Sequence, residues 1–223
     1  MKPWALLALD LDGVLIEDDS SWARYHQLLG TTHDRERNMA LFFSGNIDYE
    51  EWARMDAALW EGKDASALSG YLSSLRPRTG ASQLVSRAHS LGVATMIIST
   101  GISAVAERAA SMLGIAMVVA NEVEVANGRI TGRVRVRCGF DQKGLVLRQT
   151  ARELRIPLEC CACVGNDEND VWMFESVPFS VAFNPSSEKV ARKATVVVCG
   201  QDLLKVSEIL GRHFKSLRTC TES

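Results

Sequence analysis

The chain lacks a long apolar segment, because every continuous apolar run in its 223 residues is shorter than ten residues. A helix that spans a bilayer needs about 20 such residues, so we expect no membrane partner. The chain also lacks an excess of charge of one sign, with 25 Lys and Arg against 27 Asp and Glu and a net charge of −2. This balance creates no field that would attract nucleic acid, and we expect none as a partner.

The six cysteines lack the spacing of a disulfide framework or of a zinc site. The run CCAC at 160–163 leads directly into Val164, and we interpret it as part of a buried strand rather than as a thiol or metal site. The apolar N-terminal run lacks a small-residue cleavage site, which argues against a secretory leader. These absences together favour a reducing, cytoplasmic location.

What the chain does contain is a series of short apolar runs that alternate with amphipathic segments. The runs are continuous, which is typical of strands buried on both faces of a parallel sheet. Between them, apolar residues recur at helical spacing. The alternation predicts an α/β fold with a Rossmann-like, doubly wound parallel sheet as its core. The predicted strands are 4–11, 93–100, 115–120, 160–165, 179–183 and 194–198.

Two segments interrupt this alternation. Residues 121–136 alternate apolar and polar side chains around Asn127-Gly128, which predicts a β-hairpin at the sheet edge. Residues 16–76 are far too long for an ordinary connection and have helical patterns, which predicts a small helical cap inserted after the first strand. We therefore expect a core of residues 1–15 and 77–223, with residues 16–76 as a lid that recognises the substrate.

Polar residues stand where several predicted strands end, and ligands bind at the carboxyl ends of parallel strands. A carboxylate can attack phosphorus while a second one transfers protons, and carboxylate and amide oxygens suit magnesium. A lysine and hydroxyl groups can hold the phosphoryl oxygens. These features predict phosphoryl transfer with Mg²⁺. The candidates are Asp10, Asp12, Ser99 and Lys143 for catalysis; Asp10, Asp12, Asn166, Asp167 and Asp170 for the metal; and Ser99, Thr100, Gly101, Lys143 and Asn169 for the substrate.

Four motifs carry a resemblance to a known family. DLDGV, IISTG, the lysine of FDQKGLVL and VGNDENDVWMF resemble the motifs of the haloacid dehalogenase superfamily, specifically its phosphoserine phosphatase branch. The resemblance covers nearly the whole chain. It implies a Mg²⁺-dependent phosphomonoester hydrolase in which Asp10 forms an aspartyl-phosphate, Asp12 is the acid and base, and Ser99 and Lys143 hold the phosphate. Asp19 matches a family glutamate that meets the substrate amine.

The chain departs from this family at two informative positions. Asn166 stands where the family usually has a magnesium-binding aspartate, so either its amide oxygen or Asp167 would bind the metal. Asp56 stands where the family has an arginine that binds the phosphoserine carboxylate, and Arg54 lies on another face of the helix. An acidic residue there should repel a carboxylate, which argues against L-phosphoserine and favours a neutral or amine-bearing phosphomonoester.

Two other functions stay open on the sequence alone. A phosphomutase or phosphotransferase would use the same aspartyl-phosphate and pass the phosphoryl group to a second hydroxyl. A non-catalytic binding module of the same family would have lost turnover, for which Asn166 is the relevant change. The expected partner is a small phosphorylated molecule, and association into a homodimer is left open.

Overall fold

The computed structural model describes residues 2–221, which form one seven-stranded sheet flanked by helices. Its strand order is β4-β3-β2-β1-β5-β6-β7, and every neighbouring pair is parallel except β3 with β4. This arrangement confirms the predicted α/β fold. The strands are β1 (Ala5–Leu9), β2 (Val93–Ile102), β3 (Met117–Ala126), β4 (Arg129–Arg135), β5 (Cys161–Gly165), β6 (Phe179–Phe183) and β7 (Val196–Val198).

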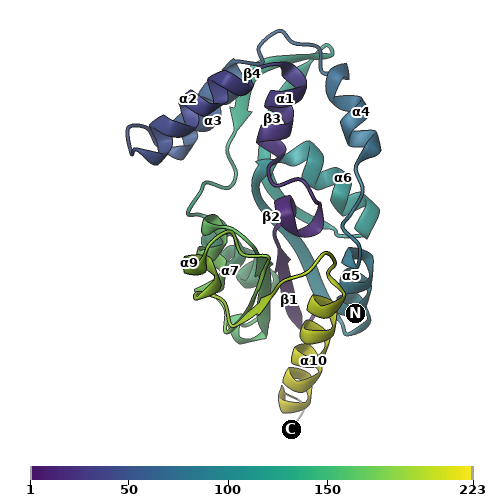
Figure 1. The fold of residues 1–223 in the computed structure, drawn as a ribbon. Helices are drawn as coiled ribbons and strands as arrows, with labels where there is room; N and C mark the ends of the chain where they lie inside the picture. The colour runs from purple at the N-terminus through teal and green to yellow at the C-terminus, as the bar shows by residue number, and fades with distance from the viewer. Residues whose placement is uncertain (1, 222–223) are drawn as a thin grey trace.

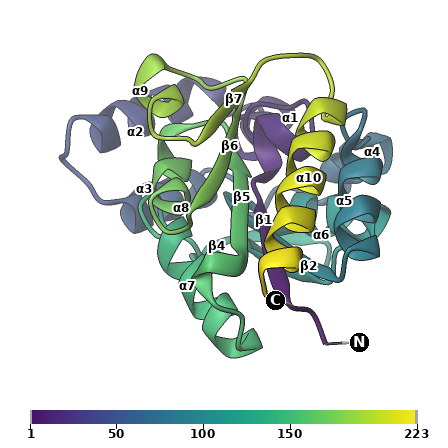
Figure 2. The same cartoon turned by 90° about the horizontal axis from the view of Figure 1, so that it is seen from below.

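Helices cover both faces of the sheet. Figure 2 shows α5, α6 and α10 on one face and α7 and α8 on the other. None of the helices within residues 2–221 combines the length and apolarity that a bilayer crossing requires. The core helices are α5 (Ala81–Ser90), α6 (Ser103–Leu113), α7 (Lys143–Leu154), α8 (Val171–Phe174), α9 (Glu188–Ala191) and α10 (Leu204–Thr221).

The strands at the centre of the sheet are completely buried, which explains their continuous apolar sequences. Every residue of β1 and of β5 is buried. Cys161, Ala162 and Cys163 of the run CCAC therefore lie in a buried strand, as the sequence predicted, and Cys160 ends the short helical turn Leu158–Cys160 before it. The three cysteines of this run and Cys138 are buried and free, whereas Cys199 is exposed. Burial raises the pKa of Cys161 to about 12, so this thiol stays protonated at neutral pH.

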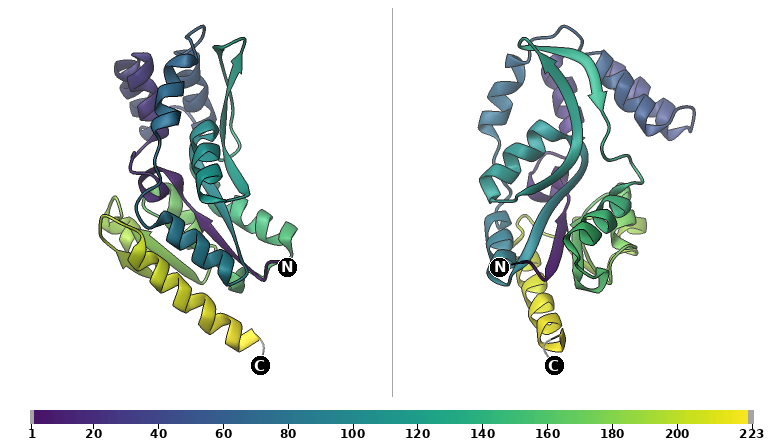
Figure 3. Two further views of the ribbon diagram at one scale, coloured as in Figure 1. Left: turned by 90° about the vertical axis from the view of Figure 1, so that its right-hand side faces the viewer. Right: turned by 180° about the vertical axis from the view of Figure 1, so that it is seen from behind.

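The edge hairpin is present, but it is longer than expected. Asn127 and Gly128 form its turn with φ angles of 50° and 75°, the left-handed conformation that this dipeptide adopts at low cost. The segments 115–120 and 121–136 were expected to be separate elements. Instead β3 is one strand, because its first half pairs with β2 and its second half pairs with β4. Beyond Asn121 it pairs with β4 alone, and the hairpin extends past the end of β2 (Figure 3).

Four helices lie between β1 and α5, at the end of the sheet opposite the two termini (Figure 1). The β3–β4 hairpin holds this group from the side, since Gly62 N donates to Ile130 O at 2.8 Å and Ala65 N to Gly128 O at 2.9 Å. The expected boundaries of the cap and its action as a lid stay predictions. The helices are α1 (Ser21–Leu29), α2 (Thr32–Phe43), α3 (Tyr49–Ala58) and α4 (Ser66–Ser74).

Candidate active site

Asp10 and Asp12 lie at the carboxyl end of β1, beside the point where the strand order reverses. The next residues form a tight turn, Leu11–Leu15, in which Gly13 has a φ of 74°. A Cβ atom on Gly13 would collide with the side chain of Asn166, so the glycine permits the close approach of the two loops. The Asp-x-Asp-Gly pattern thus reflects a backbone requirement as well as a chemical one.

Lys143, the first residue of α7, joins two of the predicted carboxylates. Its Nζ atom donates to Asp10 Oδ1 at 2.7 Å and to Asp170 Oδ1 at 2.6 Å, and all three side chains are buried. Glycine follows the lysine because a Cβ on Gly144 would strike the backbone of Trp172. Sequence positions more than 130 apart are therefore held at hydrogen-bond distance, as the motif analysis predicted.

Asp170 occupies the centre of the loop that follows β5. Its Oδ2 atom accepts from the backbone amides of Asn166 at 2.7 Å and Asp167 at 3.0 Å. Because Oδ1 already binds Lys143, both of its oxygens have partners within the protein. This arrangement fixes the loop, and the role of Asp170 as a metal ligand stays a prediction.

The side-chain amide of Asn166 lies 3.2 Å from Asp10 Oδ2 and 3.2 Å from the main-chain oxygen of Asp12. With its nitrogen on that side the amide donates two hydrogen bonds, and with its oxygen there three oxygens converge. In the second orientation the three oxygens would suit a cation, since magnesium prefers oxygen ligands. Among residues 2–221, no three His, Cys, Asp or Glu side chains gather as a metal-ligand group. This oxygen set, with an amide and a main-chain carbonyl, nevertheless fits a hard cation.

Asp167 faces a different direction. It is exposed, caps the helical turn Glu168–Asp170, and accepts from Ser186 Oγ at 2.7 Å and from Glu168 N at 2.8 Å. Of the two residues that the sequence left as alternatives, Asn166 is the one next to Asp10 and Asp12. The geometry thus supports Asn166 as the ligand, and the assignment itself stays a prediction.

Ser99 and Gly101, at the end of β2, lie beside Asp12. Gly101 N donates to Ser99 Oγ at 2.8 Å, and a Cβ on Gly101 would overlap Asp12 Oδ2 and the hydroxyls of Ser99 and Ser21. Sequence reasoning missed Ser21, which donates to Asp12 through its amide at 3.0 Å and its hydroxyl at 2.9 Å. The only signal in the sequence was a serine at the start of a helix. Serine is common there, so its presence does not reveal that it binds Asp12.

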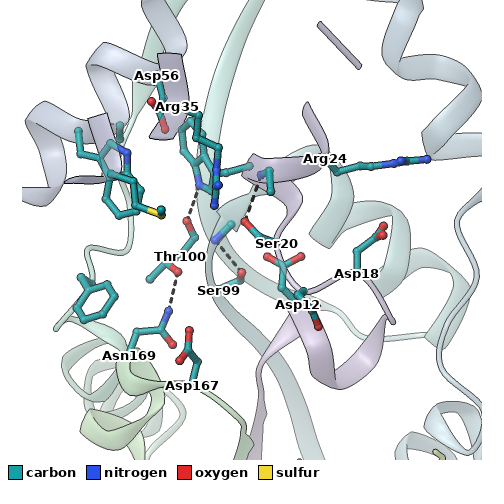
Figure 4. A pocket seen from close by; sticks show the side chains of 18 of the residues that line it. Asp12, Asp18, Ser20, Arg24, Arg35, Asp56, Ser99, Thr100, Asp167 and Asn169 are labelled. Atoms are coloured by element: carbon teal, nitrogen blue, oxygen red, sulfur yellow. Dashed lines mark hydrogen bonds between the residues drawn. The ribbon is translucent and has the colours of Figure 1, made fainter. Parts of the chain in front are cut away.

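Thr100 connects the sheet to the cap. Its carbonyl oxygen accepts from Trp22 Nε1 at 2.9 Å and from Tyr49 OH at 2.7 Å, both from cap helices, while Oγ1 accepts from Asn169 Nδ2 at 2.9 Å (Figure 4). Asn121 also donates to this carbonyl, at 2.8 Å. The buried Oδ1 atom of Asn169 has no partner among the described residues, which leaves an acceptor for a ligand.

Burial dominates the electrostatics of the two aspartates. Burial and the nearby Asp170 carboxylate raise the pKa of Asp10 despite the attraction of Lys143, because two carboxylates share that one cation. Burial also raises the pKa of Asp12 to about 6, although hydrogen bonds from Ser21 oppose the shift. Burial alone would lower the pKa of Lys143, but Asp10 and Asp170 outweigh it and keep the lysine charged. A second carboxyl group that titrates near neutral pH suits a proton-transfer role.

A cavity of about 560 Å³ opens between these strand ends and the cap. Asp19 lies at its exposed edge, as expected for a substrate contact, and its role stays a prediction. Asp56 also lines the cavity, but it is 2% exposed and its carboxylate lies 2.8 Å from Asn38 Nδ2 and 3.2 Å from His26 Nε2. This carboxylate is therefore already paired inside the cap. Sequence reasoning missed Arg35 at the same cavity, because an arginine on a polar helix usually faces solvent.

Comparison with known proteins gives the family of this site. The model of the haloacid dehalogenase-like hydrolases matches residues 7–175, which include Asp10, Ser99, Lys143 and Asp170. The chain belongs to this family. Its relatives place it in the phosphoserine phosphatase-like branch, as the motifs indicated.

Two relatives show how far the similarity extends. The chain is 29% identical over 193 residues to a phosphoserine phosphatase of Streptomyces coelicolor, covering 85% of this chain and 46% of that protein. It thus spans about half the length of that relative. A phosphoserine phosphatase of Lactococcus lactis is 28% identical over 219 residues, covering 95% of this chain and 98% of the relative.

Among solved structures, a phospho-aspartyl intermediate analogue of phosphoserine phosphatase superposes with a TM-score of 0.81 at 21% identity, covering 93% of this chain and 99% of that one. At this identity the likeness establishes the fold alone.

Proposed function

We propose that this chain is a phosphomonoester hydrolase that works through an aspartyl-phosphate on Asp10. The observation that carries the proposal is the contact of Lys143 with both Asp10 and Asp170 beside Asp12, where the strand order reverses. A buried lysine with two carboxylates is expensive to assemble for stability alone. At a ligand-binding edge, the same charges can hold and attack a phosphoryl group.

In the first step, a carboxylate oxygen of Asp10 attacks phosphorus and the bond between phosphorus and the ester oxygen breaks. Asp12 gives its proton to the departing oxygen, and its raised pKa supplies that proton near neutral pH. In the second step, water attacks the phosphorus of the aspartyl-phosphate and Asp12 takes the water proton. The bond to Asp10 then breaks and inorganic phosphate leaves. Lys143 and the Ser99 hydroxyl hold the phosphoryl oxygens.

Magnesium is part of this proposal. Asp10, the Asp12 carbonyl and Asn166 would hold it, with Asp170 as a further ligand and Asp167 as the alternative to Asn166 that the sequence left open. When bound, the ion offsets the negative charge of the carboxylates and of the phosphoryl group. The relatives of this chain are phosphoserine phosphatases, so L-phosphoserine is a natural substrate to test beside carboxylate-free esters.

We further propose that residues 16–76 act as a lid whose hydrogen bonds to Thr100 hold it over the site. A cytoplasmic location belongs to the same proposal, supported by buried thiols that remain unpaired.

The test is phosphate release from a panel of phosphomonoesters, with magnesium or with a chelator, by the wild type and Asp10→Asn. We expect metal-dependent release that falls at least about a thousandfold in the variant, because the nucleophile is gone. Transfer of the phosphoryl group to an added alcohol in place of water would favour the phosphotransferase alternative. Equal release by both proteins, or none by the wild type, would contradict the proposed hydrolase.

A further inference from the structure

The charged groups around the cavity are almost all paired within the protein. Asp56 is held by Asn38 and His26, Asp18 accepts from Tyr71 OH at 2.8 Å, and Asp167 accepts from Ser186. Arg35, on the cap helix α2, is the exception among the described lining cations. Its side chain has no ion pair or hydrogen bond within residues 2–221, and its Nε atom is buried without a partner.

Arg24 lines the same cavity and gives a useful contrast. Its Nε atom is also buried without a partner, but its Nη1 atom donates to Gln27 Oε1 at 2.6 Å and its guanidinium lies 5.5 Å from the centre of the Tyr71 ring. Figure 4 shows Arg24 extending away from the other labelled side chains, whereas Arg35 lies over Thr100 and Ser99 on the cap side. A partly buried guanidinium without a partner loses hydration, and an anion in the cavity would restore its hydrogen bonds.

One wall of the cavity that Arg35 lines is aromatic. Phe43, Tyr49 and Trp52 from the cap and Phe140 from the core loop line the cavity, and we call these four residues the aromatic wall. Phe43 lies 5.9 Å from Trp52 and 6.3 Å from Phe140 between ring centres, so the wall bridges cap and core. A cavity of about 560 Å³ with such a lining is in the size range that encloses drug-sized ligands, more than a three-carbon phosphoester fills.

We propose that Arg35 binds an anionic group of the substrate, and that the substrate's leaving group is an apolar or aromatic body that packs on the aromatic wall. This inference rests on the proposed phosphatase function and adds the substrate class. The phosphoryl group of the substrate lies at Asp10, and its apolar body lies against the aromatic wall. Its anionic group contacts Arg35, which belongs to α2. Arg35 is therefore a different position from Asp56, the position at which the family has its carboxylate-binding arginine.

The test compares phenyl phosphate with 4-carboxyphenyl phosphate, and phosphoethanolamine with L-phosphoserine, in the presence of magnesium. We expect the wild type to prefer 4-carboxyphenyl phosphate over phenyl phosphate by about 10- to 100-fold in kcat/KM, the usual size of a hydrogen-bonded charge contact. Both aromatic esters should exceed the two small ones. Arg35→Gln should remove the carboxylate preference, Arg35→Lys should restore part of it, and Arg24→Gln should keep it.

The outcomes separate the two proposals. Release from phenyl phosphate without any preference for the carboxylate, or a preference that survives in Arg35→Gln, would overturn the role of Arg35 and leave the hydrolase intact. Release that favours the two small esters over the aromatic ones would overturn the role of the aromatic wall. Absence of release from all four esters would overturn the hydrolase. In that case tryptophan fluorescence with phenylphosphonate and 4-carboxyphenylphosphonate decides whether Arg35 binds the carboxylate, since Trp22 and Trp52 line the cavity.

Discussion

At the scale of single residues, the most informative position is Asn166. Its amide reaches Asp10 and the Asp12 carbonyl, while the adjacent Asp167 points towards Ser186. A neutral ligand in this place contributes an oxygen but no charge, so it attracts a divalent cation less strongly than a carboxylate would. As the proposed metal ligand, Asn166 would keep the geometry of an oxygen ligand and give up part of the electrostatic attraction.

We predict that Asn166→Asp tightens magnesium binding about tenfold, because it adds a negative charge next to two existing oxygens. Isothermal titration calorimetry of the metal-free protein measures the Kd directly. Asp167→Asn is the matched control, which removes a charge one residue away and should change the Kd by less than about threefold. Weaker binding in Asp167→Asn with no change in Asn166→Asp would assign the metal to Asp167 instead.

At the scale of elements, the contact between α3 and the end of β2 positions the cap. Tyr49 OH donates to the Thr100 carbonyl and accepts from Asn121 Nδ2 at 3.1 Å, so one phenol joins cap, sheet and hairpin strand. Thr100 also holds Asn169 through its side chain. Thr100 thus links the position of the cap to the loop that follows β5.

We predict that Tyr49→Phe loosens the cap. Loss of the hydroxyl should raise KM for phosphomonoesters severalfold and speed limited proteolysis within residues 16–76, with about 1 kcal/mol lost from the free energy of unfolding. Tyr25→Phe is the control, since the Tyr25 hydroxyl makes no hydrogen bond to the described residues. An unchanged KM together with an unchanged proteolysis rate would mean that this hydroxyl does not position the cap.

At the scale of the whole molecule, acidic groups concentrate in the interior beneath the cap. The chain is nearly neutral, yet Asp10 and Asp170 share one buried lysine, and Asp12 lies beside them with hydrogen bonds from Ser21. The pKa of Asp12 is raised to about 6 in the folded chain from an ordinary value near 3.8, so folding favours its protonated form. Its contribution to stability is therefore complete below about pH 4 and is lost as the pH rises to about 6.

We predict that Asp12→Asn, which cannot ionise, becomes more stable relative to the wild type as the pH rises. In metal-free buffer the difference in unfolding free energy should grow by about 1–3 kcal/mol between pH 4 and pH 6.5, measured by urea unfolding. Asp64→Asn is the control, because the Ser66 amide holds the pKa of Asp64 below its usual value, so its effect on stability changes mainly below about pH 4 and little over this range. A difference that stays constant over this range would contradict a raised pKa at Asp12.

The sequence alone determined the class of fold and predicted the reacting groups. Continuous apolar runs are typical of strands buried on both faces, and Asn127-Gly128 is typical of a tight turn, so both features follow from local chemistry. The candidates Asp10, Asp12 and Lys143 followed from the rule that strand ends meet at one edge of a parallel sheet.

Only the tertiary structure decided which groups face the cavity. Whether Asp56 repels a substrate depends on His26 and Asn38, which contact its carboxylate from other helices. Likewise Arg35 is free because no carboxylate reaches it, and Ser21 matters because α1 begins beside Asp12. Such pairings join residues from separate elements, and the spacing of residues along one chain does not encode the distances between them.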